Sequence, residues 1–475
     1  MGRPGVLLLG GAAIRSRLGG ALIVAAFLIF ILYEFTGLPA LSYLASGFNL
    51  VGLVCFVPRL QRAGRLFLAI GLALLLVAVA TLEAWQGAVL TALSRGSFIA
   101  AFFTALTAIR SAAITDPNIL DCGRFLAGQP PGRRYLALTL GGHLFGLVLS
   151  YGSISLLGAL ATDNAERETN HEIRRHRTRR MLTAVQRGFT ATLAWSPLAF
   201  ASAITLTVVP GASWSSTVPL TLVSALILVV VGWALDTLFK PRLSTPAPES
   251  GPAEGEWFRH MKPLYLLLAV LMLLIVTVHL ATGIRVFGVV MALIPIISLA
   301  WIALQHGGAD SSVRNMGRRV QSFATQDIPE LKNELAILVM AAFIGSLGAA
   351  IIIPLAEGAG VSVANVPAWL LVPCAFWCIP ITGQLGMNPL LAVSLFAPLM
   401  PAPEAMGVDP AVLVCALTSG WALSGATSPY TASVLLVSAF GKITPTRVGL
   451  GWNGLYALTS GTVLSLWLLT LVLVT

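Results

Sequence analysis

The sequence predicts an all-α polytopic membrane protein with about 11 transmembrane helices and two re-entrant helical hairpins, in two inverted-topology repeats. Three observations predict this fold. The 475-residue chain is 57% hydrophobic and 10% charged, and its mean hydropathy of +0.87 lies far above that of soluble domains. Apolar stretches of about 17 residues or more recur along it, each long enough to cross a bilayer as a helix. A short motif ending in Ser-Pro occurs once in each half.

Two apolar regions, at about 135–161 and 367–400, are each interrupted near the middle by a Gly-rich polar tip. If the first were a single crossing, the basic segments 124–134 and 163–180 would fall on opposite faces of the membrane. Each region is therefore predicted to be a re-entrant hairpin that enters and leaves on one face. The predicted full crossings are approximately 20–37, 40–57, 66–84, 97–115, 183–209, 217–238, 263–282, 286–304, 335–355, 411–440 and 449–473.

The distribution of basic residues tests this topology. With a cytoplasmic N-terminus, four of the 29 lysines and arginines fall outside the segments predicted to be cytoplasmic, namely Arg95, Arg110, Arg187 and Arg285. This bias follows the positive-inside rule and makes the second hairpin open to the outside. The net charge of +10 therefore indicates membrane topology and no nucleic-acid partner. We expect a multi-pass protein of the bacterial inner (cytoplasmic) membrane, with its C-terminus external.

The same features divide the chain into five segments. Each repeat is expected to contain one hairpin followed by one broken helix, and a Pro-, Ser- and Glu-rich stretch separates the halves. The segments are N-terminal scaffold helices at 1–94, repeat 1 at 95–240 (hairpin about 135–161, broken helix 183–209), a cytoplasmic linker at 241–262, connecting helices and a cytoplasmic loop at 263–334, and repeat 2 at 335–475 (hairpin about 367–400, broken helix 411–440).

The internal repeat carries the chemistry. One copy reads Gly188-Phe-Thr-Ala-Thr-Leu-Ala-Trp-Ser196-Pro197, and the other reads Gly420-Trp-Ala-Leu-Ser-Gly-Ala-Thr-Ser428-Pro429. A proline inside a membrane helix removes a backbone donor and clashes with the preceding turn, so each helix is predicted to break there. A structural kink satisfied by neighbouring hydroxyls is the alternative. Two copies behind two hairpins favour a binding site, because broken backbone at membrane depth is tolerated where it lines a cavity.

The side chains at the tips and breaks are the candidate substrate-binding residues. Hydroxyl and amide groups there can orient a ligand, and the N-termini of the half-helices can hold an anion. Some of the hydroxyls are expected to bond backbone carbonyls one turn back instead. The candidates are Ser150, Tyr151, Gly152, Ser153, Ser155, Thr192, Trp195, Ser196, Pro197, Gly386, Met387, Asn388, Pro389, Ser424, Thr427, Ser428, Pro429, Tyr430 and Thr431.

The order of hairpin, basic loop and broken helix, twice over and inverted, resembles the ion transporter superfamily. Within it the chain is most similar to the divalent anion/sodium symporter family and the arsenite-pump type membrane subunits, over roughly 95–240 and 335–473. In those symporters a Ser-Asn-Thr motif at each tip and a Thr-Pro or Ser-Pro element at each break bind substrate and sodium. The resemblance places these roles on Ser150 to Ser155, Gly386 to Pro389, Trp195-Ser196-Pro197 and Thr427-Ser428-Pro429. It also implies a homodimer. Neither tip carries Ser-Asn-Thr.

These observations predict a secondary active transporter of a small anionic solute, working by elevator-like or rocking alternating access. No cofactor is expected, Na+ and H+ both stay open as the coupling ion, and metal binding is left open. All 19 acidic residues fall in loops or at span ends, so a carboxylate relay through the bilayer is not supported. A channel or a non-transporting membrane scaffold on the same fold is the alternative. A membrane-embedded enzyme is less favoured, because the spans offer no paired His and Asp.

Overall fold

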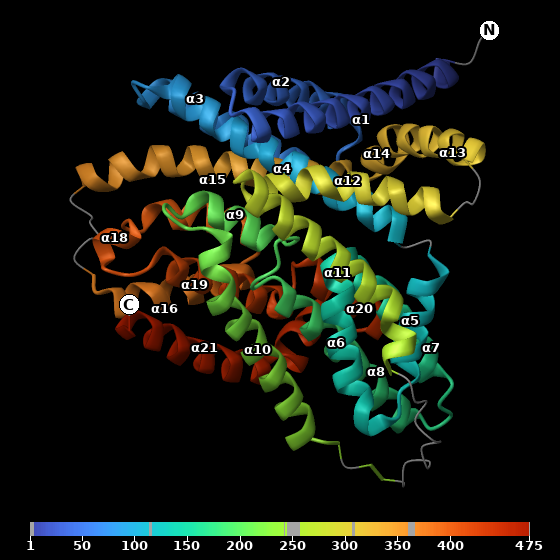
Figure 1. Cartoon of the computed structure of the whole chain (residues 1–475). Coiled ribbons are helices and arrows are strands. Elements are labelled where there is room, and N and C mark those ends of the chain that lie inside the picture. The colour runs from blue at the N-terminus through green and yellow to red at the C-terminus, as the bar shows by residue number, and fades with distance from the viewer. Residues whose placement is uncertain are drawn as a thin grey trace. The chain divides into compact units, whose positions relative to one another are not determined.

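A computed structural model describes residues 4–113, 116–241, 243–244, 257–305, 309–359 and 366–474. These residues form helices and contain no strand (Figure 1). Ten of the helices are long and apolar enough to cross a membrane. The eleventh predicted crossing, at 183–209, is divided by a non-helical segment between a 22-residue helix that is too highly charged and a 9-residue helix that is too short. The predicted all-α polytopic class is confirmed.

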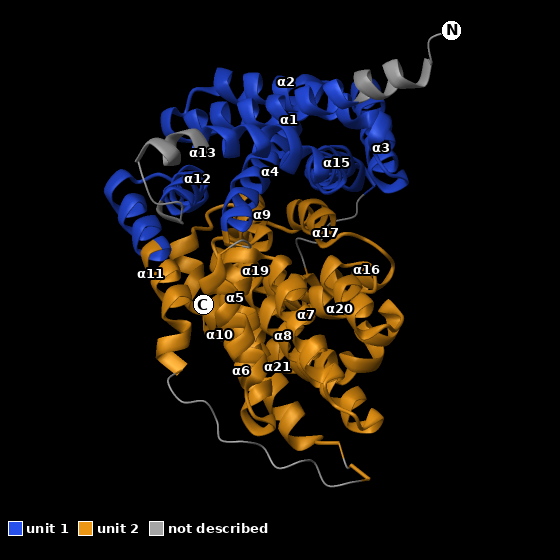
Figure 2. Cartoon of the chain, turned by 90° about the vertical axis from the view of Figure 1, so that its right-hand side faces the viewer, with its two compact units in different colours: residues 1–112, 271–362 blue, residues 113–270, 363–475 orange. Residues whose placement is uncertain are grey.

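The chain forms two compact units, which Figure 2 colours separately. Unit 1 comprises Met1–Ala112 and Leu271–Ser362, and α11 (Trp257–Thr282) runs into it from unit 2. Besides α11, the helices of unit 1 are α1 (Pro4–Thr36), α2 (Pro39–Phe56), η1 (Val57–Arg59), α3 (Arg62–Thr81), α4 (Trp85–Ala113), α12 (Val286–Gln305), α13 (Ala309–Ser322), η2 (Phe323–Asp327), α14 (Ile328–Glu330) and α15 (Lys332–Gly358). Helix α1 packs against α2, and α3 packs against α15.

Unit 2 comprises Ala113–Val270 and Val363–Thr475, and it holds both predicted hairpins and both predicted broken helices. Its helices from the first half of the chain are α5 (Pro117–Gly128), α6 (Pro131–Leu149), α7 (Gly152–Glu166), α8 (His171–Thr192), α9 (Phe200–Val208) and α10 (Trp214–Leu238). Those from the second half are α16 (Ala368–Gln384), α17 (Pro389–Phe396), η3 (Ala397–Leu399), α18 (Pro403–Met406), α19 (Pro410–Thr427), α20 (Ala432–Gly441), η4 (Arg447–Trp452) and α21 (Gly454–Val474).

The helix bounds agree with the predicted elements. Helices α6 and α7 form the first hairpin, and α16 with α17 forms the second. Helices α8 and α9 make one broken helix, and α19 with α20 makes the other. Helix α8 begins at His171, so much of the basic segment predicted as a loop is helical instead. The predicted linker lies largely outside the described residues, and the five segment boundaries stay predictions.

One glycine in each broken helix allows that helix to pack closely against the first arm of its hairpin. A Cβ on Gly188 of α8 would lie 2.0 Å from the carbonyl oxygen of Thr139 in α6. A Cβ on Gly420 of α19 would lie 2.4 Å from the carbonyl oxygen of Phe376 in α16. These are the glycines that open the two copies of the sequence repeat. Backbones approach this closely in membrane bundles where small residues face each other.

The second arms of the hairpins pack reciprocally. Helix α7, from the first hairpin, packs against α20, the far half of the second broken helix, while α17, from the second hairpin, packs against α9. A Cβ on Gly158 of α7 would meet the Phe440 ring of α20 at 2.9 Å. Each repeat therefore completes the packing of the other. This exchange is what a two-fold relation between the repeats requires.

Replacing either close-packed glycine should loosen its helix pair. We expect Gly188→Ala and Gly420→Ala each to destabilise unit 2 by about 1–3 kcal/mol, because the added methyl group overlaps a backbone carbonyl. Thermal unfolding of the purified protein in detergent measures this. Gly132→Ala, in the first turn of α6 with nothing within 4 Å, is the matched control and should keep the wild-type unfolding temperature or raise it slightly. Equal behaviour of all three variants would contradict the close approach.

Candidate substrate site in unit 2

The two helix breaks have the same hydrogen-bond pattern. After α8 ends, the Ser196 hydroxyl accepts the amide N–H of Leu198 at 3.0 Å, and the Ser196 carbonyl accepts that of Ala199 at 3.1 Å. After α19 ends, the Ser428 hydroxyl accepts the amide N–H of Tyr430 at 3.3 Å, and the Ser428 carbonyl accepts that of Thr431 at 3.2 Å. The proline after each serine disfavours helical backbone at that serine. Both Ser-Pro pairs thus form the predicted breaks, and each serine satisfies the freed backbone.

The first hairpin tip is a tight turn at Ser150 and Tyr151 between α6 and α7. Ser150 has a φ of 50°, a conformation that is rare for residues with a side chain. Its carbonyl accepts the Ser153 hydroxyl at 2.7 Å, and the Tyr151 ring lies 5.0 Å from that of Phe189 in α8. Ser155 bonds the Tyr151 carbonyl at 3.5 Å. Four of the predicted residues, Ser150, Tyr151, Ser153 and Ser155, therefore shape the tip, and Gly152 begins α7.

The second hairpin tip turns through Gly386, whose φ is 93°. The Asn388 side chain caps α17, because its Oδ1 accepts the Leu390 amide at 2.9 Å while Pro389 occupies the first turn. Asn388 thus has a structural role at the predicted position. The capped N-terminus of α17 directly follows this tip, where its partial positive charge favours an anion.

The first arm of each hairpin is joined to the broken helix of its own repeat. In the second repeat, the Ser428 hydroxyl donates to the Gly383 carbonyl at 2.6 Å, and Gln384 Nε2 donates to the Thr427 hydroxyl at 3.5 Å. In the first repeat, the Trp195 indole donates to His143 Nε2 at 3.2 Å. An indole nitrogen only donates, so His143 carries its proton on Nδ1, which donates to the Gly188 carbonyl at 3.2 Å. His143 is held neutral by this geometry.

The two breaks also meet each other. Gln186 Nε2 of α8 donates to the Ala426 carbonyl of α19 at 3.3 Å. A Cβ on Gly425 would lie 3.2 Å from side-chain atoms of both Leu193 and Thr190. The contacts therefore link the first arm of the first hairpin, both broken helices and the first arm of the second hairpin, within one unit.

Most of the predicted hydroxyls bond backbone carbonyls. Thr192 donates to Phe189, Thr427 to Leu423, and Thr431 to Ser428, at 2.7, 2.8 and 2.9 Å. Ser424 differs, because its side-chain oxygen is fully buried and has no hydrogen-bond partner among the described residues. A buried polar atom is rarely left unpaired, so Ser424 is the predicted residue whose geometry best fits a ligand contact. Tyr430 is 63% exposed, and Met387 lies in the second tip, where its amide N–H donates to the Thr382 carbonyl at 3.1 Å.

The comparisons with known proteins concern the fold. No protein-family model and no curated protein sequence matches this chain. The YdaH transporter of Alcanivorax borkumensis, whose topology is described as unusual, is similar with a TM-score of 0.53 and 16% identity, covering 87% of this chain and 98% of its own. MtrF of Neisseria gonorrhoeae, described with a class of antimetabolite efflux pumps, has a TM-score of 0.55 and 15% identity, covering 86% and 95%. The chain therefore shares the fold of these two known proteins.

Neither similar structure is described as a divalent anion/sodium symporter or an enzyme. The comparisons support the transporter architecture that the sequence resemblance implies. Similarity to the divalent anion/sodium symporter family stays a prediction. The likeness spans nearly the whole of both known chains, so it covers units 1 and 2 alike.

Sequence analysis missed a buried cation in this transporter fold. Arg187 of α8 is 7% exposed, and its guanidinium donates to Asn453 Oδ1 at 2.9 Å and to the Tyr135 hydroxyl at 3.0 Å. It also lies 4.4 Å from the centre of the Tyr456 ring, a cation–π contact. Asn453 in turn donates to Gln186 Oε1 at 3.0 Å. The cluster ties α8 to the first hairpin and to the last helix. An arginine inside an apolar stretch was the available signal.

Removing this cation should weaken unit 2. We expect Arg187→Ala to destabilise the protein by about 2–4 kcal/mol, because it leaves Asn453 and Tyr135 with buried groups that lose their donors. Arg187→Lys should recover part of that stability only, since an ammonium lacks the planar fork that reaches both partners. Thermal unfolding measures both variants. Arg133→Ala, at an exposed position in α6, is the control, and an Arg187→Ala variant as stable as this control would contradict the assignment.

Proposed function

We propose that this protein is a secondary active transporter of a small anionic solute. The observation that carries the proposal is the matched pair of helix breaks, Ser196-Pro197 and Ser428-Pro429, in two broken helices that pack against each other and against the two hairpins. The fold shared with YdaH and MtrF supports membrane transport. The anionic character of the solute is supported by helix dipoles. Helices α7, α9, α17 and α20 each begin directly after a tip or a break, and helix N-termini attract negative charge.

The proposed mechanism is alternating access, elevator-like or rocking. Unit 2 contains every predicted site residue, and we therefore place the solute-binding site in unit 2. The hairpins would open to opposite faces of the bacterial inner membrane, with a cytoplasmic N-terminus and an external C-terminus, as the distribution of basic residues favours. The reciprocal packing of α7 with α20 and of α17 with α9 supports this two-fold arrangement.

Sodium-coupled uptake of a divalent anion is the finer form of the proposal, and it rests on the sequence resemblance, as does a homodimer. Export is the second candidate, because the name given to MtrF describes efflux pumps. A proton remains the other candidate for the coupling ion. Counterflow in proteoliposomes with sodium or pH gradients of either sign distinguishes these forms.

The Ser424 hydroxyl should contribute to solute binding and not to stability. We expect Ser424→Ala to weaken saturable counterflow of labelled succinate or sulfate by about tenfold, equivalent to one hydrogen bond of ~1.4 kcal/mol, while the unfolding temperature stays unchanged. The control is Thr418→Val, on the same buried helix, whose hydroxyl already bonds the Val414 carbonyl at 3.0 Å. It should transport like wild type.

Three results would count against the proposal. Undiminished transport by Ser424→Ala would show that Ser424 does not bind the solute. Undiminished transport by the double variant Ser196→Ala/Ser428→Ala would show that neither serine of the two breaks binds it. Flux that rises with concentration without saturation, and without counterflow, identifies a channel on this fold instead of a carrier.

A further inference from the structure

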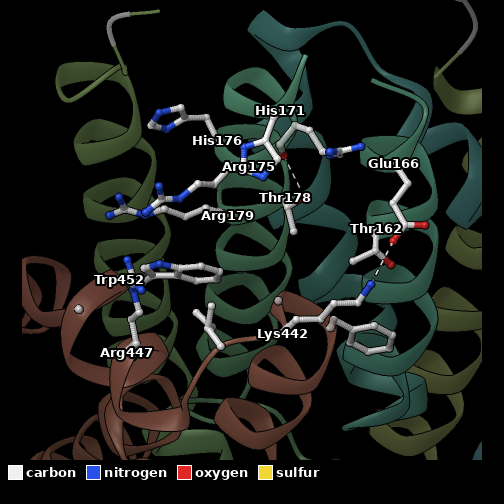
Figure 3. Close-up of a pocket in the computed structure, with 15 residues that line it drawn as sticks. Thr162, Glu166, His171, Arg175, His176, Thr178, Arg179, Lys442, Arg447 and Trp452 are labelled. Atoms are coloured by element: carbon white, nitrogen blue, oxygen red, sulfur yellow. Dashed lines mark hydrogen bonds and ion pairs between the residues drawn. The ribbon is translucent and has the colours of Figure 1, made fainter. Parts of the chain in front are cut away.

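A basic cavity lies in unit 2, apart from the tips and breaks. Its volume is about 920 Å³, within the range of ligand pockets. Helices α7 and α8 line it from the first repeat, and the end of α20 and the π-helix η4 line it from the second. In Figure 3, Arg175 and Arg179 extend from α8 toward the side that carries Arg447 and Trp452, while Lys442 reaches toward Glu166. Residues of both repeats thus build one site.

One face of α8 supplies much of the lining. The positions 171, 174, 175, 178 and 179 follow the spacing of neighbours on a single helix face, and all five residues line the cavity. Arg174, Arg175 and Arg179 lie on this face, together with His171 and Thr178. From the opposite wall come Arg447 and Lys442, the latter at the left-handed end of α20 with a φ of 52°.

Two arginines of α8 that do not line the cavity, Arg177 and Arg180, are paired with acids. Arg177 bonds Glu168 at 3.0 Å, and Arg180 grips Asp236 through two hydrogen bonds of 2.8 and 2.6 Å. The hydrogen bonds that Arg180 donates to Asp236 raise the pKa of Arg180. These two ion pairs neutralise one side of the helix.

The cavity side lacks such compensation. In the part of the chain that the structure describes, no salt bridge holds Arg174, Arg175, Arg179 or Arg447. The one carboxylate in the lining, Glu166, lies 3.5 Å from Lys442, and both side chains are more than half exposed, so this pair is weak. Burial and then the positive charges of Arg187, Arg175 and Arg447 lower the pKa of Arg179. The cavity therefore concentrates positive charge that the chain itself does not neutralise.

We propose that this cavity binds a multivalent phosphate-bearing anion, either the headgroup of an anionic phospholipid or a soluble phosphate compound. Guanidinium groups match phosphate oxygens through paired hydrogen bonds, and several of them converge here. Basic pockets between membrane helices on the cytoplasmic side hold such headgroups. The Trp452 and Phe440 side chains add apolar surface beside the cations. Because α8 and η4 come from different repeats, the bound anion would bridge them.

The test uses the full chain in nanodiscs of phosphatidylcholine, with two probes. One arm adds cardiolipin to the nanodisc, and the other adds inorganic pyrophosphate to the buffer. The lining variant is Arg175→Gln/Arg179→Gln/Arg447→Gln. The matched control, Arg124→Gln/Arg133→Gln/Arg167→Gln, removes the same charge from exposed arginines on the same predicted face that do not line the cavity. Thermal unfolding and equilibrium binding are measured for wild type and both variants.

We expect at least one probe to stabilise wild type and the control, and to bind the lining variant about tenfold more weakly for each arginine removed. A response to cardiolipin alone assigns the site to a lipid, and a response to pyrophosphate alone assigns it to a soluble phosphate. If neither probe stabilises wild type, or if both variants lose affinity equally, the proposal is overturned. Should the lining variant fail to fold, the three corresponding Arg→Lys changes keep the charge, and undiminished pyrophosphate and cardiolipin binding by them would overturn paired guanidinium recognition.

Discussion

The structure depends on one constraint, that backbone amides and carbonyls in a bilayer must find partners within the protein. Two proline-broken helices would otherwise leave such groups free. In each break the serine before the proline accepts the amide two residues on, and Ser428 also donates to a carbonyl of the neighbouring hairpin. These serines let the chain hold non-helical backbone in a buried place. The Ser428 bond also sets the second break against its hairpin, so it helps to assemble the proposed site.

The glycines and the reciprocal packing join the two breaks to the rest of unit 2. Gly188 and Gly420 bring each broken helix into backbone contact with its hairpin, and the second arm of each hairpin supports the far half of the other broken helix. Neither repeat can bury its hairpin alone. The basic cavity, away from the breaks, is also built from both halves of the chain, because α8 and η4 each supply part of its positive charge. Ligands at either place would therefore contact both halves of the chain.

The architecture could be predicted from the sequence because hydropathy, charge bias and proline act locally along the chain. The helix pairs at 131–166 and 368–396 and both helix breaks fall where these signals predicted them, while the re-entry of the hairpins into the membrane stays a prediction. The partners of individual side chains could not be predicted, because they come from segments far apart in sequence. The bonds of Arg187 to Asn453 and of His143 to Trp195 are of this kind. Hydroxyl roles were also hidden, since a serine or threonine in a helix can always bond the preceding turn, as Thr192 does and Ser424 does not.

The central claim, two hairpins that open to opposite faces of the membrane, is tested most directly by labelling single cysteines with an impermeant thiol reagent. The five native cysteines, all free, would first be replaced. Arg133→Cys and Arg167→Cys flank the first hairpin, and Trp369→Cys and Glu404→Cys flank the second, all at exposed positions. The account predicts that the first two are labelled only from the cytoplasmic side and the last two only from outside. Labelling of positions 133 and 167 from opposite sides would show a full crossing and contradict the account.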